Sequence, residues 1–208
     1  MELKGLYAVT PDLADTAELL RRVEQALLGG IRLVQYRNKA ADAALRRKQA
    51  AALLRLSHEH GARLIVNDDL SLALALDADG VHLGGDDGDL AAARAALGPG
   101  KLLGVSCYDA MERARAAKRI GADYIAFGSF FASPTKPRAV RAPLALLAEA
   151  RRETGLPVAA IGGITLQNAP QLIAAGADLL AVITDLFEAP DIRARAAAFT
   201  HLCERVTS

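Results

Sequence analysis

The stretch GARLIVNDD, residues 61–69, combines three features that decide the fold. A glycine follows an Ala- and Leu-rich segment, a short apolar run comes next, and polar residues end it. Glycine is favoured just past a helix C-terminus, and a continuous apolar run of this length is typical of a strand covered on both faces. The stretch therefore predicts the end of a helix, a buried strand and a polar loop, in that order.

The same joint recurs along the whole chain. It is present in GGIRL at 29–33, GADYI at 121–125 and GADLL at 176–180, and in variant form in GPGKLLGV at 98–105 and TGLPVAAI at 154–161. The joints predict strands over residues 4–9, 31–36, 62–66, 79–82, 101–105, 122–127, 157–160 and 178–183. They predict helices over residues 15–28, 42–59, 69–76, 87–97, 109–119, 143–153, 166–174 and 190–205.

Strand–helix units in this order favour an α/β fold, a closed (β/α)8 barrel or TIM barrel. A length of 208 residues suits one such barrel, and no Pro- or Ser-rich linker divides the chain, so we expect a single domain over residues 1–208. A doubly wound open sheet is the alternative. The first predicted turn, VTPDLAD at 9–15, lacks the glycine fingerprint of dinucleotide-binding sheets, which favours the barrel.

Composition and charge exclude several classes of partner. Aromatic residues make up 4% and Trp is absent, which argues against a stacking surface for single-stranded nucleic acid, and a net charge of +1 gives no bulk attraction for polyanions. No apolar run approaches the roughly 20 residues that span a bilayer, and the N-terminus lacks signal-peptide features. The two cysteines lack metal-like spacing and are interpreted as free thiols. We therefore expect a cytoplasmic protein with no nucleic-acid or membrane partner.

Polar residues follow the predicted strands, and in a barrel the carboxyl ends of the strands carry the chemistry. The candidates are, in chain order, Gln35, Arg37, Lys39, Asn67, Asp68, His82, Asp86, Asp87, Ser106, Ser133, Thr135, Lys136, Gly162, Gly163, Ile183 and Thr184. Residues two apart on a strand face the same side. Gln35, Arg37 and Lys39 therefore share a face, and we expect the two cations to be aimed at an anion in the barrel mouth.

Each motif also has a structural interpretation when it is taken alone. QYRNK at 35–39 fits a solvated strand end, Asp69 fits a helix N-cap, and GGDDGD at 84–89 fits a turn that starts a helix. We interpret His82 as a hydrogen-bonded core histidine and leave it out of the catalytic set. We interpret Cys107 as a packed thiol.

The combination is more specific and indicates a phosphate-handling site with a metal. Two carboxylates at neighbouring strand ends, Asp68 and Asp87, suit Mg²⁺, which binds one or two carboxylates together with water and phosphate oxygens. Three cations and a hydroxyl suit a diphosphate, through charge and hydrogen bonding; these are Arg37, Lys39, Lys136 and Ser106. Glycine-rich turns after the last two strands are where many barrels bind a phosphate through backbone N–H groups. We therefore expect two anion sites, one of them with the metal.

In these residues the chain resembles the thiamine-phosphate synthase family. The matching blocks are GLYAVT, LVQYRNK, IVNDD, DGVHLG, GVSCYD, DYIAFGSFFASPTK, VAAIGGI and GADLLAVITDLF, in this order over nearly the whole sequence. Their order and spacing are more specific than any one block. The resemblance implies a TIM-barrel transferase that joins hydroxymethylpyrimidine diphosphate to thiazole phosphate, with Mg²⁺, and gives thiamine monophosphate and pyrophosphate.

The resemblance also implies roles for individual residues. Contacts to the pyrimidine diphosphate are implied for Gln35, Tyr36, Arg37, Asn38, Lys39, Asn67, Ser106 and Lys136. Contacts to the thiazole phosphate are implied for Ser133, Pro134, Thr135, Gly163, Ile183 and Thr184. Asp68 and Asp87 are implied as the Mg²⁺ ligands. The groups implied to stabilise the departing diphosphate are Arg37, Lys39, Ser106 and Lys136.

Some positions depart from the pattern usual in the family. Gly85 stands where Gln is common, Tyr108 where His is common, and Ser133 where Thr is common. Asp185 adds a carboxylate beside the implied phosphate contacts, which weakens phosphate binding unless the side chain points away. The alternatives are a thiazole tautomerase-like isomerase, another phosphate-handling barrel enzyme, and a non-catalytic paralogue that binds thiamine phosphate.

Overall fold

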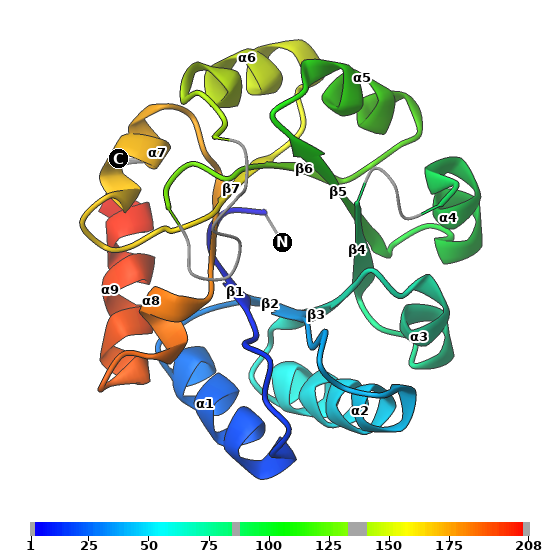
Figure 1. Ribbon diagram of the computed structural model, residues 1–208, viewed down its shortest axis with the longest axis vertical. Helices are drawn as coiled ribbons and strands as arrows, with labels where there is room; N and C mark the ends of the chain where they lie inside the picture. Colours follow the sequence, from blue (N-terminus) through cyan, green and yellow to red (C-terminus); the bar gives the residue numbers. More distant parts are fainter. Residues whose placement is uncertain (1–2, 85–87, 133–140, 206–208) are drawn as a thin grey trace.

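The computed structural model describes residues 3–84, 88–132 and 141–205 of the chain. Its strands run parallel and close into one barrel in chain order, with the helices around the outside (Figure 1). The strands are β1 (Gly5–Val9), β2 (Leu33–Tyr36), β3 (Arg63–Asn67), β4 (Gly80–Gly84), β5 (Leu102–Tyr108), β6 (Tyr124–Phe127), β7 (Val158–Ile161) and β8 (Leu179–Val182). The predicted TIM barrel is confirmed.

The helices follow the strands as the glycine joints predict. They are α1 (Thr16–Leu28), α2 (Ala43–Glu59), α3 (Leu70–Ala75), α4 (Leu90–Leu97), α5 (Met111–Arg119), α6 (Ala145–Thr154), α7 (Ala169–Ala174), α8 (Thr184–Phe187) and α9 (Ile192–Arg205). Helix α8 is not among the predicted elements, because a single turn carries no amphipathic period. Within the described ranges, no helix is long and apolar enough to cross a membrane.

Side chains on each strand alternate between the inside of the barrel and the layer beneath the helices. On β2, Leu33 belongs to the cluster inside the barrel, whereas Val34 and Tyr36 pack in the outer cluster. Burying each such aliphatic side chain contributes roughly 1.5–3 kcal/mol relative to exposure. The alternation places Gln35 on the inner face of β2, and it places Ser106 on the inner face of β5.

Carboxylates tie neighbouring strands together at the amino end of the barrel. Each stands just before a strand and accepts a hydrogen bond from the backbone of the strand before it. The bonds join Leu64 N to Asp79 Oδ2 (2.8 Å), Leu103 N to Asp123 Oδ2 (2.7 Å) and Val158 N to Asp178 Oδ2 (2.9 Å). Asp123 and Asp178 belong to the GAD joints, so the recurring motif supplies a structural carboxylate as well as a helix stop.

Candidate active site

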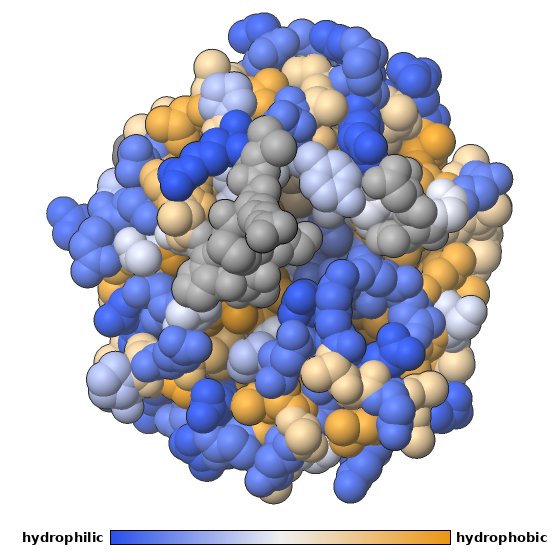
Figure 2. Space-filling view, in the orientation of Figure 1, coloured by the Kyte–Doolittle hydropathy of each residue, from blue (hydrophilic) through white to orange (hydrophobic). Residues whose placement is uncertain are grey.

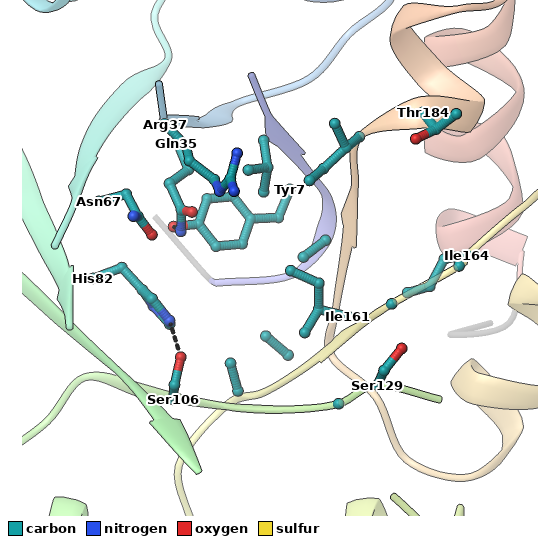
Figure 3. Close-up of a pocket in the computed structure, with 18 of the residues that line it drawn as sticks. Tyr7, Gln35, Arg37, Asn67, His82, Ser106, Ser129, Ile161, Ile164 and Thr184 are labelled. Atoms are coloured by element: carbon teal, nitrogen blue, oxygen red, sulfur yellow. Dashed lines mark hydrogen bonds between the residues drawn. The ribbon is translucent and has the colours of Figure 1, made fainter. Parts of the chain in front are cut away.

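A cavity of about 390 Å³ opens at the carboxyl ends of the strands, and every strand contributes to its wall (Figure 3). Its volume lies within the range of small-molecule sites. The predicted site residues that line it are Gln35, Arg37, Lys39, Asn67, Asp68, Ser106, Gly162, Gly163, Ile183 and Thr184. The predicted residues outside the described ranges are Gly85, Asp86, Asp87, Ser133, Pro134, Thr135 and Lys136.

The two cations of β2 and its loop are held by carboxylates. Arg37 Nη1 lies 3.0 Å from Asp12 Oδ1, and the backbone N–H of Lys39 donates to the same oxygen at 2.8 Å. Lys39 Nζ lies 3.2 Å from Asp68 Oδ2. The Arg37 side chain is only 13% exposed, so the strand end is not simply solvated. Asp12 is not among the predicted site residues, although its position after the first strand, in VTPD, is a signal for it.

Tyr36 and Asn38 face away from the cavity. The Tyr36 hydroxyl donates to Gln49 Oε1 at 2.9 Å, and Asn38 Nδ2 donates to the carbonyl oxygen of Leu13 at 2.8 Å. Both side chains are buried against the α1 and α2 side of the barrel. Any substrate contact from these two residues would therefore have to come from their backbones.

The end of β3 places a carboxylate and an amide side by side on the rim. Asp68 has a backbone φ of +59°, a left-handed conformation that is uncommon for a non-glycine residue, and its N–H donates to the carbonyl oxygen of His82 at 2.9 Å. Asn67 also lines the cavity. The next residue, Asp69, accepts from Leu72 N at 2.9 Å and caps α3, as expected from the sequence. The NDD motif thus divides into a cavity-lining pair and a helix cap.

His82 is both a hydrogen-bonded core residue and part of the cavity wall. Its Nε2 lies 2.8 Å from Ser106 Oγ (Figure 3). Its Nδ1 lies 3.1 Å from the Tyr124 hydroxyl. Its hydrogen-bonded character agrees with the prediction, whereas its place in the cavity wall was not predicted. Tyr7 and Tyr124 were not predicted either, and the available signal was their inward position on β1 and β6.

The wall formed by β7 and the loop after β6 depends on close backbone contact. Gly162 and Gly163 have φ of +104° and +62°, which favour glycine. A Cβ on Gly163 would overlap the carbonyl oxygen of Ala132, and one on Gly162 would overlap Ser129 Oγ. The IGGI motif is therefore required by packing at this wall, whatever it binds.

Two departures from the family pattern lie on the cavity rim. Asp185 is paired with Arg195, whose Nη1 is 2.6 Å from Asp185 Oδ2, so the charge of the added carboxylate is compensated. Tyr108 has a φ of +54°, is 39% exposed, and has the guanidinium carbon of Arg113 5.0 Å from its ring centroid. Both residues line the cavity.

The two thiols are buried and unpaired with each other. Burial raises the pKa of Cys107 to about 12 and that of Cys203 to about 11. Neither residue lines the cavity. Cys107 is therefore a packed thiol on the outer face of β5, as expected from the sequence.

Comparison with known proteins identifies the family. The family model for thiamine monophosphate synthase matches residues 6–186. Thiamine-phosphate synthase from Aromatoleum aromaticum is 60% identical over 200 residues, which cover 96% of each chain. The corresponding protein from Azoarcus sp. is 58% identical over 96% of this chain and 97% of the relative.

Solved structures agree with the sequence comparisons. Thiamine phosphate pyrophosphorylase from Pyrococcus furiosus superposes with a TM-score of 0.85 at 33% identity, covering 99% of this chain and 98% of that one. A 3-hexulose-6-phosphate synthase has a TM-score of 0.72 at 19% identity, over 95% of this chain and 99% of that one, and this likeness shows the barrel fold alone. The chain belongs to the thiamine monophosphate synthase family.

Proposed function

We propose that this member of the family joins hydroxymethylpyrimidine diphosphate to thiazole phosphate and forms thiamine monophosphate and pyrophosphate, with Mg²⁺. The observation that carries the proposal is the convergence of cationic, carboxylate and hydroxyl groups on one cavity. These groups belong to Arg37, Lys39, Asp68 and Ser106, and they come from three separate segments of the chain. The high identity to named synthases supports the same reaction.

Arg37 and Lys39 are suited to stabilise the charge on a departing diphosphate. In the structure each has a carboxylate partner, Asp12 for Arg37 and Asp68 for Lys39. Arg37 is nearly buried and is oriented by both oxygens of Asp12, at 3.0 and 3.1 Å. A cation held in place before the reaction stabilises developing charge without reorganising. Lys39 is more exposed, and it is free to turn from Asp68 to a phosphate oxygen.

The rim residues fit a magnesium ion that is shared with the substrate. The described residues contain no group of three His, Cys, Asp or Glu side chains that could hold a metal by themselves. Asp68, however, presents a carboxylate beside the amide of Asn67, and Mg²⁺ commonly takes only one or two protein carboxylates, with water and phosphate oxygens as its other ligands. Asp68 would be one ligand, and Asp87, outside the described residues, is proposed as the second. When bound, Mg²⁺ neutralises charge on the diphosphate.

The remaining wall suits an uncharged ring and its nucleophile. Val9, Ala126, Ala159 and Ile161 give part of the cavity wall an apolar surface, against which a ring would be shielded from water. The C–O bond to the diphosphate breaks with its electron pair on the leaving group, and the aminopyrimidine stabilises the cationic methylene. The lone pair of the thiazole nitrogen forms the new C–N bond. No proton has to move, so positioning of the two substrates supplies much of the remaining rate.

A pyrophosphate-release assay tests the proposed function. The purified protein is incubated with the pyrimidine diphosphate and thiazole phosphate, alone and together, with Mg²⁺ or with EDTA. Pyrophosphate and thiamine monophosphate are expected in equal amounts, and only when both substrates and Mg²⁺ are present. Activity that survives EDTA would remove the metal from the proposal.

The same assay separates the alternatives. Conversion of the thiazole substrate without pyrophosphate release would indicate an isomerase. Tight binding of thiamine phosphate without turnover, measured by calorimetry, would indicate a binding protein.

Pyrophosphate titrated into the protein should bind more tightly with Mg²⁺ than without it, and Asp68→Asn should reduce that difference.

A further inference from the structure

A chain of hydrogen bonds crosses the barrel beneath the cavity, from β2 to β5. Gln35 Nε2 donates to the Tyr7 hydroxyl at 2.7 Å, and the hydroxyls of Tyr7 and Tyr124 are 2.7 Å apart. The Tyr124 hydroxyl lies 3.1 Å from His82 Nδ1, and His82 Nε2 lies 2.8 Å from Ser106 Oγ (Figure 3). These five residues are called the Gln35–Ser106 chain; Tyr7, Gln35, His82 and Ser106 line the cavity, and Tyr124 connects Tyr7 to His82 in the barrel interior.

The barrel interior is built around this chain. The rings of Tyr7 and Tyr124 meet edge to face with centroids 5.8 Å apart, and His82 stacks on Tyr124 at 5.5 Å. A Cβ on Gly104 would overlap the Tyr124 hydroxyl, so the glycine on β5 leaves the space that the chain occupies. Tyr7 and Tyr124 are 1% and 0% exposed. Such a set of buried polar groups is stable only when each finds a partner.

The chain of hydrogen bonds has a fixed direction at its Gln35 end. The Gln35 amide donates to the Tyr7 hydroxyl, whereas the distances from Tyr7 to Tyr124 and from Tyr124 to His82 fit either direction. One arrangement gives each phenol proton its own acceptor: the Tyr7 proton is directed at Tyr124, and the Tyr124 proton at His82 Nδ1. A neutral imidazole that accepts at Nδ1 carries its proton on Nε2. Burial raises the pKa of both phenols well above the usual value, so both keep their protons at neutral pH.

We propose that the Gln35–Ser106 chain runs in one direction and fixes His82 as the Nε2–H tautomer, so that Ser106 accepts from His82 and donates its own proton into the cavity. Tyr7, Tyr124 and His82 are then positioning residues that act through Ser106. Under the function proposed above, on which this assignment rests, the acceptor of the Ser106 proton is a phosphate oxygen of the departing diphosphate. A hydroxyl held as a donor contributes more there than one free to rotate.

The tautomer of His82 tests the direction without any substrate. Nitrogen-15 NMR of the ligand-free wild-type protein at neutral pH distinguishes the two tautomers, and the His82 signals are assigned from their loss in His82→Asn. The Nε2–H tautomer is expected. The Nδ1–H tautomer would overturn the proposal, because His82 would then accept the Ser106 proton. This result does not depend on which reaction the protein catalyses.

A double-mutant cycle tests whether Tyr124 acts through Ser106. Ser106→Ala and Tyr124→Phe should each lower kcat about tenfold, the loss expected for one hydrogen bond to a charged group, with little change in the KM of either substrate. The double variant should be no slower than Ser106→Ala. Losses that multiply would overturn the proposal, since Tyr124 would then act independently of Ser106.

Two further variants guard against a folding artefact. Tyr7→Phe breaks the chain one step further from the cavity and should lower kcat in the same direction as Tyr124→Phe. Thr154→Val removes a buried hydroxyl that donates to Ala150 O in α6, outside the barrel, and should leave kcat unchanged. Equal losses of kcat in Tyr124→Phe, Tyr7→Phe and Thr154→Val would show a general effect on stability and would contradict the positioning role. If the wild-type protein releases no pyrophosphate, the proposed function fails, while the NMR result still decides the tautomer.

Discussion

At the amino end of the barrel, the carboxylate of Asp178 accepts a hydrogen bond from the backbone N–H of Val158 at 2.9 Å and also pairs with Arg151. At the carboxyl end, the carboxylate of Asp68 pairs with the side chain of Lys39 at 3.2 Å. The carboxylate of Asp178 gives the buried N–H of Val158 a hydrogen-bond acceptor, which is a structural role. The carboxylate of Asp68 holds a flexible cation that can exchange its partner.

This difference separates residues that maintain the barrel from residues that act on a ligand. Removing a carboxylate at the amino end leaves a buried N–H without an acceptor and lowers the free energy of unfolding. Removing a charge at the carboxyl end leaves side chains that water can reach from the cavity mouth. We therefore expect substitutions at the amino end to change stability and substitutions at the carboxyl end to change activity. The space-filling view shows this rim, with polar and apolar residues mixed around the opening (Figure 2).

The largest effect is expected from Arg37→Ala. Loss of a preorganised cation beside the departing diphosphate should lower kcat/KM about 100- to 1,000-fold. The midpoint of thermal unfolding should change little. Arg32→Ala is the matched control, because Arg32 precedes the same strand at its amino end and is exposed. Similar activity losses in both variants would contradict the division between the two ends.

Gly163→Ala should have the next largest effect, and it should act on one substrate. Gly163 has a left-handed φ of +62° and no room for a Cβ beside Ala132. The wall must move, so we expect the KM for thiazole phosphate to rise about tenfold, which corresponds to about 1.4 kcal/mol, while the KM for the pyrimidine diphosphate is unchanged.

Gly155→Ala is the matched control for the backbone strain. Gly155 has a similar φ of +68°, but its Cβ would meet nothing within 4 Å. It should therefore lower the free energy of unfolding by about 1 kcal/mol, the cost of a left-handed alanine, with no change in either KM. Equal KM changes in the two variants would mean that strain, and not the contact with Ala132, is responsible.

Asp178→Ala should lower stability and spare activity. Val158 is fully buried, and its N–H would be left without an acceptor, which costs about 1–3 kcal/mol. Chemical denaturation measures this loss, and kcat is measured at a temperature where the variant remains folded. A fall in kcat without a fall in stability would show that the amino end takes part in function.

The sequence predicted the barrel well because its signals are local and repeated. Each joint combines a glycine stop, a buried apolar run and a polar end, and together they gave the order of strands and helices. Helix α8 was missed because a single turn has no period. The structural role of Asp123 and Asp178 was also missed, since their acceptor function depends on the neighbouring strand, which lies about 20 residues away in sequence.

The site was predicted less completely, because its partners come from distant segments. Strand geometry predicted that Gln35, Arg37 and Lys39 share a face, and all three line the cavity. The ion pair between Asp12 and Arg37 could be found only from the fold. His82 shows the same limit, because its hydrogen bonds join three strands. The alternation along a strand predicts which side chains face the barrel interior, but it does not predict which side chains of other strands they contact.

The smallest effect is expected for the thiol of Cys107, which extends the comparison from the two ends to the two faces of one strand. Ser106 faces the cavity, whereas Cys107 is buried on the outer face with its pKa raised to about 12. At pH 8, only about one thiol in ten thousand is then a thiolate, compared with roughly a quarter for a free cysteine. Iodoacetamide should therefore leave Cys107 unmodified and kcat unchanged in the folded protein, with mass spectrometry as the measurement, and should modify it in denaturant.

Because the folded pKa lies above the unfolded value, the stability that this thiol contributes is fully present below about pH 8.5 and is lost as the pH rises toward 12. Modification at pH 8 with a parallel loss of activity would mean that the outer face of β5 opens to the cavity, and the inner and outer roles of this strand would have to be reassigned.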